Sequence, residues 1–416
     1  MPRAAVTERR FLSLYRSLGL LPLLTLCIAG LAAIVHHQSS LPRAYTWLEP
    51  LRTLQDVVSE QNFIAAIVAV FLLGRFRLRG GWRFDLVLDG ARLRRSVLAR
   101  MALGACLIAA DVALFEHHTW LDALGLMIAA LVLPVPASSQ RRRVVGEVVV
   151  AALVFLLICY AFTIFKALVL VDRSLWDTRI VAFERSLFGV EPHRYFAALG
   201  ARSPRLSVWC DWVYFHFFPH MALVNVLLVG MRASRERIEY LGALAICYIL
   251  GGPLYWLFPG VGPSYHEPQL FRFLQDIPHG LTLPVRGWLD GNTQAVLMGK
   301  AQVVRTWGYV ACMPSLHIAQ EVVMLWYARR SRLALTISLL FTGLTVLAVM
   351  LLGWHYPTDV VAGCAVAALA VWLARRFRGS LLPRRVMPAD DPAVPPRPEL
   401  SELLSGLRRL ATTRLG

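Results

Sequence analysis

Two short stretches of the chain carry histidines and a carboxylate at spacings that suit covalent group transfer. The first is residues 313–317 (MPSLH) and the second is residues 353–359 (GWHYPTD). Because His355 and Asp359 are four residues apart, a helix beginning between them would keep both at one end and on one side. Together with His317 they offer a nucleophile, a group that orients it and a second proton carrier.

Each stretch lies at the edge of an apolar run, where a helix is expected to begin. Pro314 and Pro357 stand just inside these expected starts, where the missing N–H and the fixed φ of proline are tolerated. Free N–H groups at a helix start attract anions, and Ser315 can add a hydroxyl or an amide donor. The two stretches therefore predict a site for an anionic substrate.

The chemistry that these residues suit best is transfer of a phosphoryl group. Such a transfer needs a nucleophile, a leaving group that gains a proton and positive charge around the phosphoryl oxygens. Neutral histidine is a good nucleophile at physiological pH because its pKa lies near neutrality. Asp359 could accept the Nδ1–H of His355 and leave Nε2 free to attack, as the carboxylate does in a Ser-His-Asp triad.

PSLH, followed 38 residues after its histidine by the HxxxD pattern of HYPTD, resembles the type-2 phosphatidic acid phosphatase superfamily. PSLH in place of the more usual PSGH is closer to the inositol phosphorylceramide synthase branch. The resemblance covers residues 144–378. It implies that His355 forms a phosphohistidine and that His317 protonates the departing oxygen. It also implies that the Pro-rich segment 258–265, with Ser264 and Tyr265, borders the phosphate pocket.

The sequence departs from the superfamily pattern where cations are expected. Ala348 and Val349 stand where the motif SRxxxxxHxxxD has Ser and Arg. Lys166 and Arg173 have the spacing of the motif KxxxxxxRP, but Ser174 replaces its proline and the pair lies far before His317, so it is set aside. The synthase branch resembles this chain in lacking both motifs.

The long loop 259–311 offers replacements for these cations, namely Arg305, Lys300, Arg286 and Arg272. Arg305 is chosen because it is nearest to His317 in sequence. The predicted catalytic residues are His355, His317 and Asp359, and the predicted phosphate- or substrate-binding residues are Ser315, Arg305, Ser264, Tyr265, Tyr214 and His216.

Composition indicates a membrane protein, because 57% of the residues are hydrophobic and only 17% are charged. Several apolar runs approach the ~20 residues that a spanning helix needs. We therefore predict an all-α integral membrane protein with about ten transmembrane helices. The expected spans are 17–35, 59–74, 101–116, 120–136, 144–171, 206–231, 238–258, 312–328, 333–354 and 359–374.

These spans divide the chain into three regions. Residues 1–143 are expected to form an accessory region of four transmembrane helices. Residues 144–378 are expected to form a six-helix, phosphatidic-acid-phosphatase-like catalytic bundle, followed by a Pro/Arg-rich cytoplasmic tail at 379–416. The amphipathic stretch 172–205 is expected to lie on the membrane surface, and the loop 259–311 is long enough to cover the site.

The net charge of +17 comes mainly from arginines in the short loops. Nucleic acid is not expected as a partner, because loop arginines set orientation and meet anionic lipid. Ten spans then place both termini in the cytoplasm and both histidines at the extracytoplasmic face of the cell membrane. The Arg-rich segments are 141–143, 232–237, 329–332 and the stretch after 375; the short loops without Lys or Arg are 117–119 and 355–358.

The sixth expected span carries a polar stripe of Asp211, Tyr214, His216 and His220. Such a stripe faces the interior of a helix bundle or a cavity, so Tyr214 and His216 are predicted to line the substrate cavity. Structural hydrogen bonding is the alternative. The seven cysteines form no CxxC pair, and no ligand cluster accompanies the motifs, so no metal and no cofactor are expected.

The predicted function is that of a membrane-embedded lipid phosphotransferase. A lipid phosphate or phospholipid would donate a phospho-head group, and a lipid alcohol would accept it. The alternative is a lipid phosphate phosphatase that transfers the group to water. Two non-enzymatic alternatives are a transporter or scramblase with a polar cavity, and a structural membrane subunit. The sequence does not indicate an oligomeric state.

Overall fold

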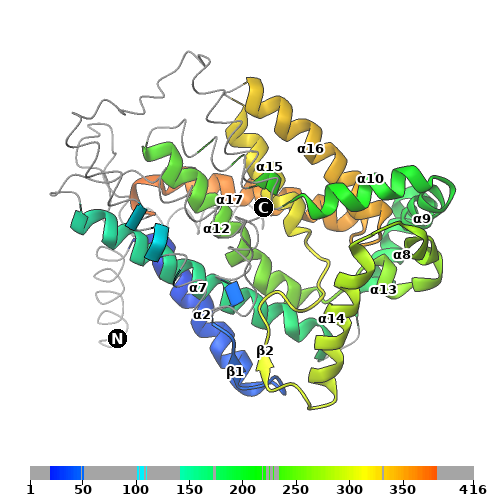
Figure 1. Cartoon of the computed structure of the whole chain (residues 1–416), viewed down its shortest axis with the longest axis horizontal. Helices are drawn as coiled ribbons and strands as arrows, with labels where there is room; N and C mark the ends of the chain where they lie inside the picture. The colour runs from blue at the N-terminus through cyan, green and yellow to red at the C-terminus, as the bar shows by residue number, and fades with distance from the viewer. Residues whose placement is uncertain are drawn as a thin grey trace, which may run out of the picture.

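The computed structural model of the chain describes residues 19–47, 49–50, 101–102, 104–106, 109, 141–171, 175–217, 219–221, 224, 228, 234–329 and 332–381. This part is predominantly helical, as expected (Figure 1). The long helices are α2 (Leu20–Gln38), α7 (Arg141–Val171), α12 (Ser234–Leu257), α15 (Leu316–Ala328), α16 (Arg332–Leu351) and α17 (Pro357–Arg376). The shorter helices between them are α8 (Asp177–Phe188), α9 (Pro192–Arg202), α10 (Pro204–Phe215), α13 (Pro263–His266), η1 (Pro268–Asp276), α14 (Thr282–Leu297) and η2 (Arg378–Ser380).

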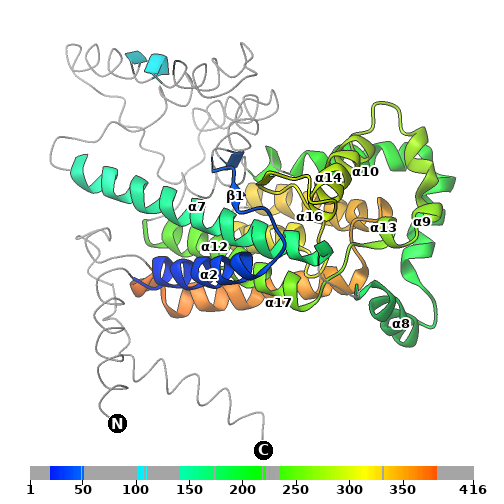
Figure 2. The same cartoon turned by 90° about the horizontal axis from the view of Figure 1, so that it is seen from below.

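The long helices form a bundle in which α12 packs against α7, α15 and α17. Helix α15 also packs against α16 and α17, and α10 packs against α16. Figure 2 shows α2, α7, α12 and α17 running side by side, with α8, α9, α13 and α14 gathered at one end of the molecule. This end is where the two sequence motifs lie.

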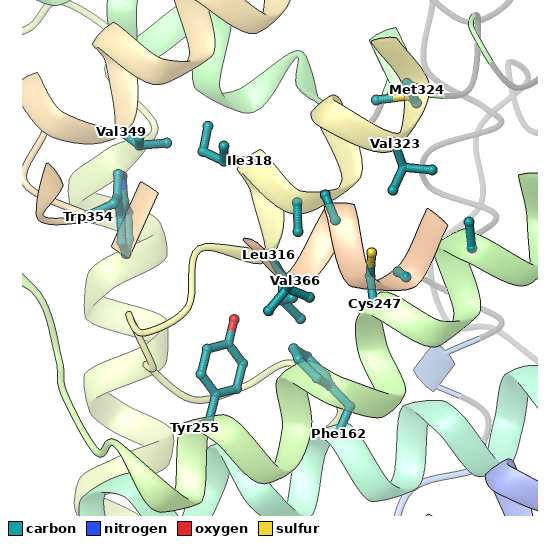
Figure 3. Close-up of a cluster of buried hydrophobic side chains, with 14 of the residues drawn as sticks. Phe162, Cys247, Tyr255, Leu316, Ile318, Val323, Met324, Val349, Trp354 and Val366 are labelled. Atoms are coloured by element: carbon teal, nitrogen blue, oxygen red, sulfur yellow. The ribbon is translucent and has the colours of Figure 1, made fainter. Parts of the chain in front are cut away.

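Apolar side chains from four helices fill the space between α12, α15 and α17. Figure 3 shows Phe162 of α7 and Tyr255 of α12 facing Leu316 of α15 and Val366 of α17. Lipid tails are as apolar as leucine, so close contact between helices stabilises such a bundle more than removal from water does. Gly363 of α17 provides this contact, because a Cβ there would meet the carbonyl oxygen of Ser315 at 2.4 Å.

Four described helical segments are long and apolar enough to cross a membrane, and α7 adds a shorter apolar stretch, Leu153–Val169. The four are Leu20–Gln38, Ile238–Leu257, Ala334–Leu351 and Pro357–Arg376. The count of ten stays a prediction, because the second to fourth expected spans fall largely on residues 51–100 and 111–140, outside the described residues. Helix α15 covers an expected span but has only 13 residues.

Helix α2 lies with the bundle and not apart from it. It packs against α7 and α12, and the backbone N–H of Leu21 donates to the carbonyl of Leu381 at 3.0 Å. After α2, the chain forms β1 (Ala44–Tyr45), which pairs in parallel with β2 (Val303–Val304). This two-residue pairing is the exception to the all-α expectation. Helix α2 thus contacts helices on the other side of the expected boundary at residue 143, and the division into regions stays a prediction.

The loop between α12 and α15 is folded. It contains α13, η1 and α14, and it packs back onto the turn that precedes α17. The expected helices within 172–205 are also present as α8 and α9. Their exposed apolar side chains include Phe183, Leu187, Phe188 and Tyr195. Their place on a membrane surface stays a prediction.

Candidate functional site

His355, Asp359 and His317 lie together where α15 and α17 begin. His355 sits in the turn between α16 and α17, and its ring centroid is 5.8 Å from that of His317. The Nδ1 atom of His355 is 3.5 Å from Oδ2 of Asp359, which lies in the first turn of α17. The structure therefore brings the two motifs into one site, although 38 residues separate their histidines.

Both His355 and Asp359 are buried and held by neighbouring groups. The backbone carbonyl of Cys312 interacts with the imidazole of His355, and the Cys312 thiol interacts with the Asp359 carboxylate. Within the described residues, Nδ1 of His355 forms no hydrogen bond. Asp359 Oδ2 also accepts the backbone N–H of Tyr356 at 2.8 Å. Burial lowers the pKa of His355 to about 3, against the opposing effect of the Cys312 carbonyl. His355 is therefore neutral at physiological pH, as a nucleophile must be.

Helix α8 holds the turn around His355 through two buried carboxylates. Asp177 accepts N–H groups of Val261 at 3.0 Å and Gly262 at 2.9 Å, and the Tyr356 hydroxyl at 3.1 Å. These contacts connect the Pro-rich segment to the start of α17.

The second carboxylate of α8 caps the first turn of α17. Glu184 accepts the backbone N–H of Thr358 at 2.8 Å and its hydroxyl at 2.7 Å. Burial raises the pKa of Glu184, while the bonds from Thr358 act in the opposite direction. Asp177 and Glu184 were missed in the sequence. Their spacing of seven residues, two turns on one face of an amphipathic helix, is the signal that could have found them.

His317 lies among aromatic rings. The ring of Tyr214 is 5.1 Å from it and that of Phe217 is 5.0 Å from it, measured between centroids.

Ser315 caps α15, with its hydroxyl accepting from Ile318 N at 3.5 Å. The backbone N–H of Ser315 donates to the carbonyl of Asp359 at 3.0 Å, which joins the two motifs directly.

Two residues of the Pro-rich segment contact the turn that carries His355. Ser264 is buried, and both its N–H and its hydroxyl donate to the Gly353 carbonyl, at 3.0 and 2.6 Å. Its hydroxyl therefore shapes the turn before His355. The ring of Tyr265 lies 6.3 Å from that of Trp354, the residue next to His355.

Two predicted binding residues lie elsewhere. Arg305 is 48% exposed and forms an ion pair with Glu49 at 2.9 Å, beside the β1–β2 pairing. His216 stacks on Trp212 with ring centroids 3.9 Å apart, and its Nδ1 lies 2.7 Å from the Trp212 carbonyl. Within the described residues neither side chain contacts His317 or His355. Their roles in substrate binding stay predictions.

Two other cations are near the histidines. Lys166 of α7 interacts electrostatically with both His355 and His317. Lys166, set aside on the basis of motif position, is therefore again a candidate cation of the site, while Arg173 lies outside the described residues. Arg286 of α14 is buried, and its Nη2 donates to the Leu352 carbonyl at 3.1 Å, three residues before His355.

Comparison with protein families gives one match. Residues 178–373 match the PAP2 superfamily model. The matched stretch contains both histidines and Asp359, and it supports the superfamily that the motifs resemble. PAP2 proteins are all-α membrane phosphatases and phosphotransferases, so the match supports a lipid phosphatase or phosphotransferase type of function. Comparisons with curated proteins and with solved structures gave no match.

The departures from the PAP2 motifs have a structural explanation. Ala348 and Val349, which stand in place of Ser and Arg, are completely buried in α16. The Val349 carbonyl accepts N–H groups of Trp354 at 2.9 Å and His355 at 3.1 Å. This position therefore shapes the turn and supplies no charge.

The polar stripe of the sixth expected span divides between two roles. Tyr214 lies at the site, but Asp211 accepts the backbone N–H groups of Leu281 at 2.9 Å and Thr282 at 3.0 Å, capping α14. His220 faces Glu321 of α15, with Nδ1 3.0 Å from Oε1. Structural hydrogen bonds are thus present on this segment, and the lining of a substrate cavity by Tyr214 stays a prediction.

One group of described residues outside the PAP2 motifs has the spacing of a cation site. The ligand atoms of Glu191, His193 and Glu267 lie within 4.8 Å of one another. Arg194 pairs with both glutamates and Arg185 pairs with Glu191. Because two arginines already neutralise the two carboxylates, the group is a poor match to a metal ion, and it contributes no ligand atom to the histidine site.

A surface cavity of about 980 Å³ lies between α8, α9 and the start of α17. Its lining combines Phe188, Tyr195 and Met350 with Arg185 and Arg194. It touches Pro357 but neither His317 nor His355.

Proposed function

We propose that the protein is a membrane-embedded lipid phosphotransferase that moves a phospho-head group to a lipid hydroxyl, as in the inositol phosphorylceramide synthase branch. One observation carries the proposal. A neutral, buried His355 lies beside a carboxylate, with a second histidine 5.8 Å away between ring centroids. This arrangement provides a nucleophile, its orienting group and a proton carrier in one place.

In the proposed first step, Nε2 of His355 attacks phosphorus and the bond to the departing lipid oxygen breaks. Asp359 holds the imidazole through Nδ1 and stabilises its positive charge. His317 gives its proton to the departing oxygen. In the second step His317 takes the proton of the acceptor hydroxyl, that oxygen attacks phosphorus, and the His355–phosphorus bond breaks. The cation Lys166 would offset charge on the phosphoryl oxygens.

Transfer to a lipid alcohol is favoured over hydrolysis by the folded loop 259–311. Ser264 and Arg286 both bond to carbonyls of the turn before His355, so the loop covers this side of the site. Excluding water favours an alcohol acceptor. The second candidate is a lipid phosphate phosphatase, which the superfamily match supports equally well.

The test supplies a donor phospholipid labelled in its head group to the purified protein, with and without ceramide or diacylglycerol. Label appearing in a new lipid only when the acceptor is present supports transfer. Quantitative release of inorganic phosphate from a lipid monophosphate, unaffected by any acceptor, would identify a phosphatase instead.

The proposed mechanism uses no metal ion. Activity should therefore survive incubation with EDTA and subsequent removal of the chelator. Loss of turnover in EDTA with recovery on adding Mg²⁺ or Zn²⁺ would require a different mechanism. Tight binding of a cation to wild-type protein without any effect on turnover would leave the histidine mechanism intact.

The proposed location is the cell membrane, with the site at the extracytoplasmic face and both termini in the cytoplasm. Gln275 on η1 and Arg329 at the end of α15 are both exposed, and the proposal places them on opposite sides. In a Cys-depleted background, Gln275→Cys should react with an impermeant maleimide in intact cells and Arg329→Cys should not. The reverse labelling pattern would overturn this orientation.

A further inference from the structure

Arg286 is a buried cation that forms no ion pair with a carboxylate within the part of the chain that the structure describes. The residue is only 8% exposed. Among the described residues, its Nη2 donates to the Leu352 carbonyl at 3.1 Å and its Nε has no hydrogen-bond partner. Burial lowers the pKa of Arg286 to about 10, so it still carries its charge at neutral pH. A buried charge is costly unless an anion compensates it.

Aromatic rings connect Arg286 to the histidine site. The guanidinium carbon lies 5.1 Å from the ring centroid of Tyr265 and 5.2 Å from that of Trp354. Tyr214 stacks on Trp354 at 5.2 Å, and its own ring is 5.1 Å from His317. Two rings, those of Trp354 and Tyr214, therefore lie between Arg286 and His317.

Asp211 of α10 and Asp290 of α14 flank Arg286 on either side along the helix. Asp211 caps the helix by accepting the N–H groups of Leu281 and Thr282, one turn before Arg286. Asp290, one turn after it, interacts with Arg286 electrostatically without forming an ion pair. The guanidinium is thus fixed by its helix, while most of its five N–H donors stay available.

We propose that Arg286 binds a phosphate oxyanion of the lipid substrate and supplies the cation that the second histidine motif lacks. The inference rests on the proposed function, because it assumes that the substrate brings phosphate to the histidine site. Arginine suits the role, since its planar donors bind phosphate in pairs. The bond to the Leu352 carbonyl would place the bound anion beside the turn that carries His355.

The test measures binding of inorganic phosphate by isothermal titration calorimetry in a non-ionic detergent. The protein carries His355→Ala, so no covalent product forms. Adding Arg286→Gln should weaken phosphate binding at least tenfold, and Arg286→Lys should restore part of the loss because charge returns without the paired donors. Arg205→Gln is the matched control, since this exposed arginine of α10 loses the same charge and should bind as the parent does.

A second arm distinguishes the phosphoryl group from an anionic head group. With His355 intact, kcat/KM is measured for donors with charged and with uncharged head groups. If Arg286→Gln lowers both about equally and weakens phosphate binding, the anion is the transferred phosphoryl group. If phosphate binding is unchanged and only the charged donor suffers, the anion is in the head group.

Unchanged phosphate binding together with unchanged kcat/KM for both donors would overturn the inference. Arg286→Lys guards against a misfolded Arg286→Gln protein, because it keeps the charge and the packing of the stem. Should wild-type protein bind phosphate through Arg286 yet form no phosphohistidine and transfer nothing, the proposed function would fail while the anion site stands.

Discussion

His355 and His317 face each other, but they are held in different ways. His355 is 4% exposed and lies between the Asp359 carboxylate, the Cys312 carbonyl and a turn fixed by α8. His317 is partly exposed, and its contacts are the rings of Tyr214 and Phe217. Within the described residues its imidazole forms no hydrogen bond.

This difference matches two chemical roles. In-line attack needs a nucleophile held in one orientation, and a small displacement from that geometry reduces the rate strongly. A proton carrier must serve first the departing oxygen and then the acceptor hydroxyl, so a fixed partner for its imidazole would compete with both. The comparison therefore supports the proposal that His355 attacks and His317 transfers the proton, as the resemblance also implies.

The largest expected effect is the loss of turnover when either histidine is replaced. The two replacements should differ in how the loss depends on the leaving group of the donor. His355→Ala should abolish turnover of every donor, because no phosphorus–nitrogen bond can form. His317→Ala should severely impair turnover of a natural phospholipid but largely recover with an aryl phosphate donor, whose leaving group needs no proton. The measurement is kcat/KM for both donors in detergent. Near-normal activity of His355→Ala, or equal loss of both donors in His317→Ala, would contradict the assignment.

A smaller but still large loss of activity is expected on replacing Asp359, the carboxylate that lies beside His355 and not beside His317. Asp359→Asn should reduce kcat by roughly 10³–10⁴, by analogy with replacement of a triad aspartate. The Asn side chain still accepts the Tyr356 N–H, so the start of α17 should remain folded. Single-turnover formation of the phosphohistidine, followed by rapid quench, is the measurement. An unchanged rate of formation would mean that the 3.5 Å approach of His355 to Asp359 has no catalytic role.

The next effect concerns α8, which contacts the His355 turn but not His317. Glu184→Gln keeps an acceptor for Thr358 but removes its charge, and it should reduce kcat about tenfold with little change in KM. Bonds to a charged acceptor contribute about 1.5–3 kcal/mol, so a modest fall in the unfolding temperature is expected as well. Asp276→Asn, an exposed carboxylate of η1, is the control. A change confined to KM would indicate a substrate contact instead of a positioning role.

The sequence predicted the three residues at the centre of the site because local signals mark them. A proline at a helix start and a four-residue spacing are properties of neighbouring residues. Ser315 at the start of α15 and the placement of Tyr214 follow from the same kind of pattern. Their roles in turnover stay predictions.

The supporting residues could not be predicted in this way, because their contacts are distant in sequence. Asp177 meets Tyr356 across 179 positions, and Arg286 meets Leu352 across 66. The ion pair of Arg305 could not be predicted for the same reason: the chain after α2 returns to this loop, and Glu49 pairs with the arginine. A role for Arg305 in substrate binding stays a prediction. The packing of α2 against α7 and α12 could not be predicted either, because packing between helices leaves little mark on either sequence.

The smallest expected effect tests how completely His355 is buried. Because burial lowers the pKa of His355 to about 3, from about 6.5 in the unfolded chain, the folded protein keeps it neutral while the unfolded chain takes up a proton. Stability therefore falls as pH drops from about 6.5 towards 3, and between pH 7 and pH 5 the loss from this one group is about 2 kcal/mol. The effect is absent above pH 7, where neither state is protonated.

The measurement is thermal unfolding in detergent at pH 7 and pH 5, for wild type and His355→Gln. Glutamine has no proton to gain, so the variant should lose less stability on acidification than wild type does. The buried His193, whose pKa burial also lowers, adds acid sensitivity to both proteins equally and cancels in the difference. His279→Gln, at an exposed position, should behave as wild type. Equal acid sensitivity in wild type and His355→Gln would show that water reaches His355, and the contrast between a fixed, dry nucleophile and a free proton carrier would then have to be given up.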